Sequence, residues 1–413
     1  MVGMDINDSL FGERLAEAVE LVTSAGATVA QTVTGKRARP DASTFAGSGK
    51  VEEIAASVAA HDANLVVFNH QLSPIQIRNI EKVVGVRVID RTDLILDIFG
   101  QRARSAEGKL QVDLAQMQHL MTRLVKGWTH LERQRGGIGV RGGPGETQLE
   151  LDRRLVGERI KRLKEKLKKL ERQRNTQRSS RRRAGVFNVG IVGYTNAGKS
   201  TLFNRMTHSS TYVADKLFAT LDTTTRKLYV EPGIHVTVSD TVGFIRDLPH
   251  GLVAAFRATL TEAMEADLLL HVVDAAGSMR EQQIVDVNLV LAEIGATSIK
   301  QVIVLNKIDK LEGTPFAVIL RNEDGKIAEL RVSALEGIGM DLVRQAVKEH
   351  AIDNGCCIAH EQFSEPVGIA TLREAQEMPL SRLASQRGKP ESGLEVPKTR
   401  DTDTTRSELN AVI

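Results

Sequence analysis

The feature that most constrains the fold is a glycine-rich octapeptide that directly follows a short apolar segment. Residues 193 to 200 read Gly-Tyr-Thr-Asn-Ala-Gly-Lys-Ser, after the apolar run from Val189 to Val192. Two glycines four residues apart, followed by Lys and Ser, form the phosphate-binding loop motif at a strand-to-helix junction. The glycines let backbone amides wrap an anion at the positive end of the following helix. The motif predicts nucleotide contacts at Gly193, Tyr194, Thr195, Asn196, Ala197, Gly198, Lys199, Ser200 and Thr201.

A chance glycine-rich turn is the alternative, and motifs downstream argue against it. Two of them suit the phosphate end of a nucleotide, where the Ser200 hydroxyl and that of Thr220 are expected to ligate Mg²⁺. Asp240 can hold a magnesium-bound water, and the Gly243 amide can sense the terminal phosphate. Lys199 is the predicted catalytic residue, because its charge stabilises the transferring phosphoryl group. The two motifs comprise Phe218, Ala219, Thr220, Leu221 and Asp222, and Asp240, Thr241, Val242 and Gly243.

Two more motifs suit a guanine base. The Asp309 carboxylate can accept two hydrogen bonds, from guanine N1 and the exocyclic amine, which adenine cannot offer. A backbone amide near Ser333 can support the guanine oxygen. The motifs are Asn306, Lys307, Ile308 and Asp309, and then Ser333 and Ala334. All five motifs in this order predict an α/β, Ras-like P-loop GTPase domain over residues 184–350, with GTP as substrate and Mg²⁺ as cofactor.

The residue that orients the attacking water is not evident from the motifs. Many GTPases use a Gln directly after the Asp-x-x-Gly element, and here that position is Phe244. One interpretation is a slow intrinsic hydrolase. The favoured interpretation is that a partner orders the segments around Thr220 and Asp240, called the switch segments, and so triggers turnover. The protein alone would then hydrolyse GTP slowly.

The first 108 residues predict a small parallel α/β domain. Helical spacing over 51–60 and 74–83 alternates with apolar segments at 64–68 and 86–90, a pattern that favours a parallel sheet covered by helices. Ser73 is the expected helix cap, before Pro74. The Gly-Ser-Gly-Lys sequence at 47–50 allows a second phosphate site, but a plain turn is favoured.

Residues 109–183 predict an antiparallel coiled helical hairpin. Apolar residues recur at spacings of three and four from Leu114 to Leu131 and again from Val156 to Leu170, around a glycine-rich connector at 136–145. Between residues 123 and 183 there are 20 Lys or Arg against 7 Asp or Glu. A solvated helical face is the simpler interpretation, but this excess favours RNA contact. The predicted RNA-binding residues are Arg135, Arg141, Arg153 and Arg154.

The remaining sequence features concern the later strands, the tail and the cellular location. A β-hairpin is expected about Pro232, and later strands are expected at 268–273 and 301–305. The composition of residues 351–413 predicts a poorly ordered tail. No apolar run is long enough to cross a bilayer. The only cysteines, Cys356 and Cys357, are adjacent, which favours a reducing, cytoplasmic location.

Over residues 18–350 the sequence resembles the HflX family of ribosome-associated GTPases. The most specific match is the glycine-rich run at 136–154, and the segments 39–50, 88–99 and 240–246 are similarly close. The resemblance implies binding to the 50S ribosomal subunit, with the hairpin tip at the peptidyl-transferase region of 23S rRNA. It implies a role in ribosome splitting or rescue, stress response or late assembly, and it suggests ATP binding by the amino-terminal domain. We expect a monomer.

The sequence departs from the family pattern in two places, directly after the 218–222 motif and in the tail. Thr223 stands where the family usually has Pro, and the tail after about His350 does not resemble the family's small carboxy-terminal domain. An alternative function is an RNA-binding assembly module in which GTP is structural and hydrolysis incidental. An RNA helicase or other ATPase conflicts with the guanine preference of Asp309.

Overall fold

The computed structural model of the 413-residue chain describes residues 1–127, 148–209, 217–246, 262–313 and 316–355. All of these belong to one compact unit that extends from Met1 to Ile358. The glycine-rich connector with Arg135 and Arg141, and the tail from residue 356, lie outside the described residues. The domain boundaries predicted from the sequence stay predictions.

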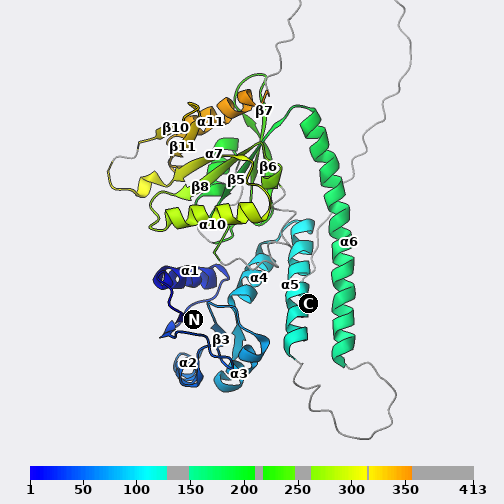
Figure 1. Ribbon diagram of the computed structural model, residues 1–413, viewed down its shortest axis with the longest axis vertical. Helices are drawn as coiled ribbons and strands as arrows, with labels where there is room; N and C mark the ends of the chain where they lie inside the picture. Colours follow the sequence, from blue (N-terminus) through cyan, green and yellow to red (C-terminus); the bar gives the residue numbers. More distant parts are fainter. Residues whose placement is uncertain (128–147, 210–216, 247–261, 314–315, 356–413) are drawn as a thin grey trace, which may run out of the picture. The chain divides into compact units, whose positions relative to one another are not determined.

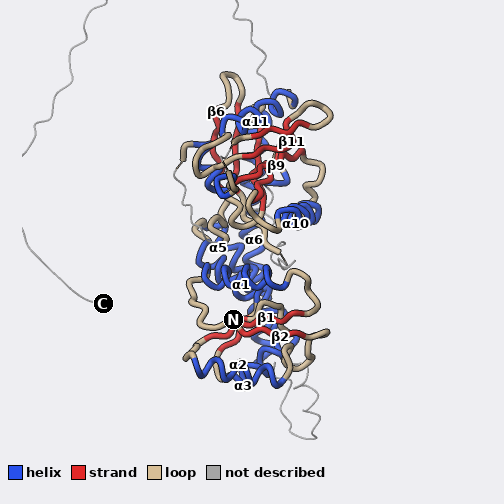
Figure 2. The backbone as a smooth tube through the Cα atoms, turned by 90° about the vertical axis from the view of Figure 1, so that its left-hand side faces the viewer, coloured by secondary structure: helices blue, strands red, loops and turns tan. Residues whose placement is uncertain are grey.

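The first hundred residues form short parallel strands covered by helices, as expected. Strand β1 pairs in parallel with β2, β3 pairs in parallel with β4, and a bridge from Val2 to Phe68 joins the two pairs. Helices α2 and α3 lie on one side of β1 and β2, and α1 lies on the other (Figures 1 and 2). The elements are β1 (Val2–Asp5), α1 (Phe11–Ser24), β2 (Val33–Lys36), α2 (Ser48–Ala60), β3 (Leu65–Val67), α3 (Pro74–Val84), β4 (Arg87–Ile89) and α4 (Arg91–Arg102).

The helix caps in this region follow the sequence signals. Ser73 caps α3 by accepting a hydrogen bond from the Gln76 amide, and the Gln76 side chain returns to the Ser73 amide. Asp90 and Asp93 form the same reciprocal arrangement at the start of α4. Such caps satisfy amides that have no partner within the helix, and each stabilises it by about 1 kcal/mol.

The basic segment forms two helices that run side by side, α5 (Ala106–Gly127) and α6 (Gln148–Arg183) (Figure 1). Glu107, at the start of α5, pairs with Arg174 near the end of α6 at 2.9 Å, so the helices are antiparallel. Leu114 and Leu163 are buried in the seam. At 36 residues, α6 is about 54 Å long.

The GTPase-like domain is built on a seven-stranded sheet in the order β10-β11-β9-β8-β5-β7-β6. Pairing is parallel except for the antiparallel edge pairs β6–β7 and β10–β11. The β6–β7 hairpin turns at Pro232 and Gly233, as expected. The elements are β5 (Phe187–Gly193), α7 (Lys199–Thr207), β6 (Thr224–Tyr229), β7 (His235–Asp240), β8 (Leu268–Asp274), α10 (Arg280–Glu293), β9 (Lys300–Asn306), a 3-10 turn (Ile308–Lys310), β10 (Val318–Arg321), β11 (Ile327–Arg331) and α11 (Met340–Asp353).

A single cluster of buried apolar side chains joins the amino-terminal part of the chain to the GTPase-like domain. It contains Leu21 of α1, Phe99 of α4 and Val112 of α5 together with Phe218 and Phe244. Since buried apolar contact is the main source of folding stability, this shared cluster stabilises the parts jointly. None of the described helices is long and apolar enough to cross a membrane.

Candidate nucleotide-binding site

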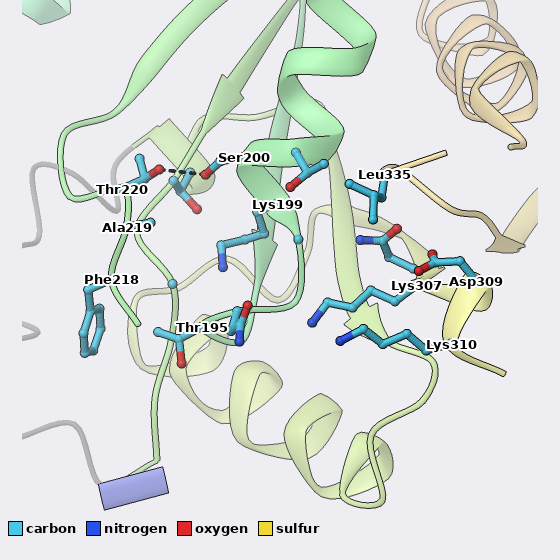
Figure 3. Close-up of a pocket in the computed structure, with 16 residues that line it drawn as sticks. Thr195, Lys199, Ser200, Phe218, Ala219, Thr220, Lys307, Asp309, Lys310 and Leu335 are labelled. Atoms are coloured by element: carbon cyan, nitrogen blue, oxygen red, sulfur yellow. Dashed lines mark hydrogen bonds between the residues drawn. The ribbon is translucent and has the colours of Figure 1, made fainter. Parts of the chain in front are cut away.

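A cavity of about 340 Å³ lies where β5 meets α7, at the predicted phosphate-binding loop (Figure 3). It contains side chains from four of the five sequence motifs, and Leu335, which lines it too, directly follows the fifth. The cavity is lined by Thr195, Asn196, Gly198, Lys199, Ser200, Thr201, Phe218, Ala219, Thr220, Thr241, Gly243, Asn306, Lys307, Asp309, Lys310 and Leu335.

Two glycines of the loop are required by close backbone approach. Gly193 has a φ of 146°, and a Cβ there would lie 2.1 Å from the carbonyl oxygen of Val272. Gly198 has a φ of 93°, and a Cβ would lie 2.2 Å from the Asn306 Nδ2 atom. Side chains are excluded at both positions, and Gly198 directly precedes α7. The loop therefore keeps its amides open to an anion at the start of the helix.

Lys199 is held inside the site rather than extended into solvent. Its Nζ donates a hydrogen bond to the Tyr194 carbonyl oxygen at 2.6 Å, and only 6% of the residue is exposed. Burial lowers the pKa of Lys199 to about 8, against the opposing attraction of Asp240. In Figure 3 the amino group points into the cavity, where phosphate oxygens would replace lost solvent.

Three oxygen-bearing side chains meet beside Lys199. The Ser200 hydroxyl lies 2.7 Å from the Thr220 hydroxyl and donates to the Asp240 Oδ2 atom at 2.7 Å. The other Asp240 oxygen, Oδ1, is buried without a hydrogen-bond partner, and burial raises the Asp240 pKa. Hydroxyl and carboxylate oxygens are the ligands that Mg²⁺ prefers, so this donor set and the unpartnered oxygen fit the predicted ion.

At the end of the cavity away from Ser200 and Thr220, hydrogen bonds connect the two base-binding motifs to each other and to the phosphate loop. Asn306 donates from Nδ2 to the Ala197 carbonyl oxygen at 2.9 Å and accepts from the Ala334 amide at 2.9 Å. Asp309 accepts a hydrogen bond from the Ser333 hydroxyl at 2.5 Å. These contacts fix the Asp309 carboxylate at the cavity, where it can accept two hydrogen bonds from guanine.

Several predicted contact residues do not line the cavity themselves. Asp240, Ser333 and Ala334 support residues that do, whereas the Asp222 carboxylate points to the start of α5. The others outside the lining are Gly193, Tyr194, Ala197, Leu221, Val242 and Ile308. Sequence reasoning missed Lys310 and Leu335, and their only signal is that each directly follows a base-binding motif.

Phe244 occupies the position where a water-orienting Gln was sought. Its side chain is 3% exposed and packs in the apolar cluster with Phe218. Its backbone bridges the phosphate loop, since its carbonyl oxygen accepts from the Thr195 amide at 2.7 Å and its amide donates to the Gly193 carbonyl at 3.1 Å. Phe244 thus braces the loop and has no side-chain atom that could orient water.

The Gly-Ser-Gly-Lys sequence at 47–50 has a local structural explanation. Its lysine, Lys50, donates to the Thr34 carbonyl oxygen and pairs with Glu53 at 2.6 Å. A Cβ at Gly47 would lie 1.9 Å from Arg37, whose guanidinium donates to a neighbouring carbonyl. These contacts give the sequence a structural role, but not as the plain turn that was favoured: Gly47 precedes α2, and Ser48 to Lys50 form its first turn.

The described part of the basic hairpin presents its charge to solvent. Arg153 and Arg154, which were predicted to bind RNA, are both exposed on α6. Nine further cations on this helix are also exposed: Arg159, Lys161, Arg162, Lys164, Lys166, Lys168, Lys169, Arg172 and Arg183.

Three family models match consecutive parts of the chain. They are described as GTP-binding GTPase N-terminal, over residues 12–100, GTP-binding GTPase middle region, over residues 102–181, and 50S ribosome-binding GTPase, over residues 188–307. The first range covers the amino-terminal region after β1, the second covers most of the hairpin, and the third covers the phosphate loop through Lys307.

Curated proteins of one family match about four-fifths of the chain in sequence. "GTPase HflX" of Escherichia coli strain K12 is 54% identical over 337 residues, covering 82% of this chain and 79% of that protein. "GTPase HflX" of Magnetococcus marinus is 49% identical over 327 residues, covering 79% of this chain and 75% of the relative. This identity and coverage show that the chain, with its P-loop GTPase domain, belongs to the HflX family of GTPases, which hydrolyse GTP.

Proposed function

We propose that the protein is a GTP-driven switch that binds the 50S ribosomal subunit through its basic hairpin. The observation that carries this proposal is the meeting of Ser200, Thr220 and Asp240 at one phosphate-binding loop. Segments held together at this point respond to the terminal phosphate and separate after hydrolysis. The matching model described as 50S ribosome-binding GTPase supports the choice of partner.

Different residues are proposed to bind the phosphates, the Mg²⁺ ion and the guanine base. Backbone amides of the loop and the Lys199 amino group bind the phosphates and balance the charge that develops during transfer. Ser200 and Thr220 would hold Mg²⁺, with Asp240 behind them, and the ion supplies positive charge to the phosphates. Asn306 positions the loop, and Asp309 selects guanine. Together these groups position GTP for hydrolysis, and none of them forms a covalent bond to it.

The position directly after the Asp-x-x-Gly element supplies no side-chain group that could orient water. Phe244 is buried there and has no polar side-chain atom, so we expect the protein alone to hydrolyse GTP slowly. The ribosome is the proposed trigger, because ordering the switch segments on a large partner supplies the missing positioning of water.

The hairpin is the proposed RNA-binding element, reaching 23S rRNA with its tip. Exposed cations along α6, including Arg153 and Arg154, suit an RNA backbone, and Arg135 and Arg141 are proposed contacts in the connector. Ribosome splitting or rescue, stress response and late subunit assembly are the processes in which such a switch would act. The cytoplasmic location and the monomeric state stay predictions, as does ATP binding by the amino-terminal domain.

Co-sedimentation with purified subunits tests the proposal. The protein is expected to pellet with 50S subunits and not with 30S, more strongly with a non-hydrolysable GTP analogue than with GDP. Lys199→Ala should remove the nucleotide dependence, whereas Lys50→Ala, which removes the lysine of the Gly-Ser-Gly-Lys sequence at 47–50, should leave it intact. Failure to pellet with 50S in the presence of magnesium and any guanine nucleotide would contradict the proposal.

The buried Phe244 also favours the alternative of an RNA-binding assembly module with incidental hydrolysis. Lys199→Ala separates the two functions. If ribosome splitting persists while hydrolysis by this variant is abolished, hydrolysis is incidental and the alternative is favoured. If splitting is lost together with hydrolysis, the switch holds.

A further inference from the structure

We infer that Asp222, in the segment that carries Thr220, is a nucleotide-controlled cap for the hairpin helix α5. This inference rests on the proposed switch and names the contact through which the nucleotide state reaches the hairpin. Asp222 acts through Ser105 and the first turn of α5, so it is a positioning residue. It does not line the nucleotide cavity.

The start of α5 has an incomplete capping box. Ser105 directly precedes the helix, and its hydroxyl accepts a hydrogen bond from the Gly108 amide at 2.8 Å. In a complete box, a Glu or Gln three residues after the cap returns to the backbone amide of the cap residue. That position is Gly108, which has no side chain. The Ser105 amide therefore needs an acceptor from elsewhere.

Asp222 supplies that acceptor from a point 117 residues further along the chain. Its Oδ2 atom accepts from the Ser105 amide at 2.7 Å and from the Arg104 amide at 2.8 Å, and its Oδ1 atom accepts from the Ser105 hydroxyl at 2.5 Å. These are short, charge-assisted hydrogen bonds, and the carboxylate lies at the positive end of a helix.

Because Gly108 has no side chain, it leaves room for the Asp222 carboxylate. A Cβ at Gly108 would lie 2.1 Å from the Asp222 Oδ1 atom. The residue is buried and helical, with no positive φ that would demand glycine. Glycine in a helix interior is otherwise unfavourable by roughly 1 kcal/mol relative to alanine. Close approach of Asp222 is thus the reason for a glycine here.

The segment from Leu217 to Asp222 joins the nucleotide site to the rest of the chain. The Leu217 amide donates to the Ser24 hydroxyl at the end of α1 at 3.0 Å, and the Phe218 ring packs edge-on against Phe99 of α4 at 4.7 Å. Between these contacts and Asp222, the Thr220 hydroxyl meets Ser200 at the nucleotide.

Thr220 and Asp222 are two residues apart, so their Cα atoms stay within about 7 Å of each other and a large displacement of one carries the other with it. When Thr220 leaves the nucleotide after loss of the terminal phosphate, Asp222 is drawn from the α5 cap. The Ser105 and Arg104 amides are then left without this acceptor, and the first turn of the hairpin helix loosens.

Amide hydrogen exchange in the full-length protein tests this coupling without the ribosome. Peptides that cover residues 104–112 should exchange about fivefold more slowly with a non-hydrolysable GTP analogue than with GDP, as expected for one cap. Asp222→Ala should abolish this difference and, because coupling is reciprocal, weaken the affinity for the GTP analogue by no more than about fivefold while leaving GDP affinity unchanged. Asp324→Ala, which removes an exposed carboxylate from the turn between β10 and β11, is the matched control and should keep the difference.

Gly108→Ala distinguishes coupling from helix propensity. If Gly108 were an ordinary helical residue, alanine would slow exchange at the start of α5. Displacement of Asp222 by the new methyl group should instead speed exchange in the GTP-analogue state and remove the nucleotide difference. Slower exchange in Gly108→Ala, or a nucleotide difference that survives in Asp222→Ala, would overturn the inference.

The outcomes also separate this inference from the proposed function. If the wild-type protein pellets with 50S subunits but residues 104–112 exchange equally in both nucleotide states, the inference fails and the function stands. If the exchange difference is present but the protein does not pellet with 50S, the function fails and the cap stands.

Discussion

Gly198 carries the strictest requirement on any one residue lining the nucleotide cavity. Its φ of 93° suits glycine, and a Cβ would lie 2.2 Å from the Asn306 side chain that ties the loop to the base-binding motifs. We expect Gly198→Ala to weaken GTP binding at least about thirtyfold, because backbone strain and the displaced Asn306 act together at roughly 1–3 kcal/mol each. Calorimetric titration with GTP and magnesium measures the loss.

Gly49→Ala is the matched control for that substitution. Gly49 also directly precedes a lysine, in the first turn of α2, and a Cβ there meets nothing within 4 Å. The variant should bind GTP as the wild type does and gain up to about 1 kcal/mol of stability from helix propensity. Unchanged GTP affinity in Gly198→Ala would contradict the requirement for glycine in the phosphate loop.

His271 predicts a loss of stability in acid. It is 1% exposed in the central strand β8, and burial lowers its pKa to about 4, although a hydrogen bond with Gln301 opposes this. The unfolded chain, with an ordinary value near 6.5, binds the proton first as pH falls. Stability is therefore full above about pH 6.5 and declines towards pH 4, by about 1.4 kcal/mol at pH 5.5.

Urea unfolding at pH 7.5 and 5.5 measures this contribution. His271→Leu should show a smaller decline between the two pH values than the wild type, whatever its stability at pH 7.5. Equal declines in the two proteins would mean that His271 does not titrate differently in the folded and unfolded states.

At the level of elements, ion pairs join α4 to α5. Asp93 contacts Arg123 and lies 3.0 Å from the His119 ring, and Arg123 also reaches Asp90 at 3.5 Å. Burial alone would raise the pKa of Asp93, but His119 and Arg123 bring it below its ordinary value. Asp93 thus caps α4 and pairs with α5 at once.

We expect Asp93→Asn to destabilise the protein by about 1–2 kcal/mol, since it removes the nearest partner of Arg123 in a half-buried site and leaves only Asp90 at 3.5 Å. Asp97→Asn, on the exposed side of α4 one turn later, should change stability by less than about 0.5 kcal/mol. Urea unfolding of both variants at pH 7.5 measures the difference. Equal, small effects would show that the ion pairs contribute little to docking of α5.

Elements with strong local signals could be predicted from the sequence. Helix α3 begins at its Ser-Pro signal, and α2, β3 and β4 match their expected segments to within a few residues. Strands β1 and β10 were not anticipated, because each is four residues long and is defined by its pairing partner. Helix α6 extends well beyond its apolar repeat, since charged residues with good helix propensity continue it to Arg183.

The nucleotide cavity was predictable to the extent that its chemistry lies in short motifs. Spacing alone placed Lys199, Ser200 and Asp309 at one cavity. The turn of Asp222 towards Ser105 could not be predicted, because it depends on contacts between residues far apart in the sequence. Close approach at Gly108 has the same origin.

For the whole molecule, the charge of α6 predicts a steep salt dependence of RNA binding. Each cation that neutralises a phosphate releases counterions, with a contribution of roughly 0.7–0.9 to the slope of log affinity against log salt. Replacing both Arg153 and Arg154 with Gln should therefore lower the slope for 50S binding by about 1.4–1.8. Replacing Arg226 and Lys227, exposed on β6, is the matched control and should leave it unchanged. A wild-type affinity that is flat across salt concentrations would make α6 a solvated face only.

The apolar cluster that Leu21, Phe99 and Val112 share with Phe218 and Phe244 bears on how such a chain can change over evolutionary time. A larger or smaller side chain on one side of a packed boundary has to be matched on the other, because dense interiors tolerate little change in volume. The amino-terminal sheet and the GTPase domain should therefore diverge in step. A chimera that takes these two parts from distant relatives would inherit two mismatched halves of one core.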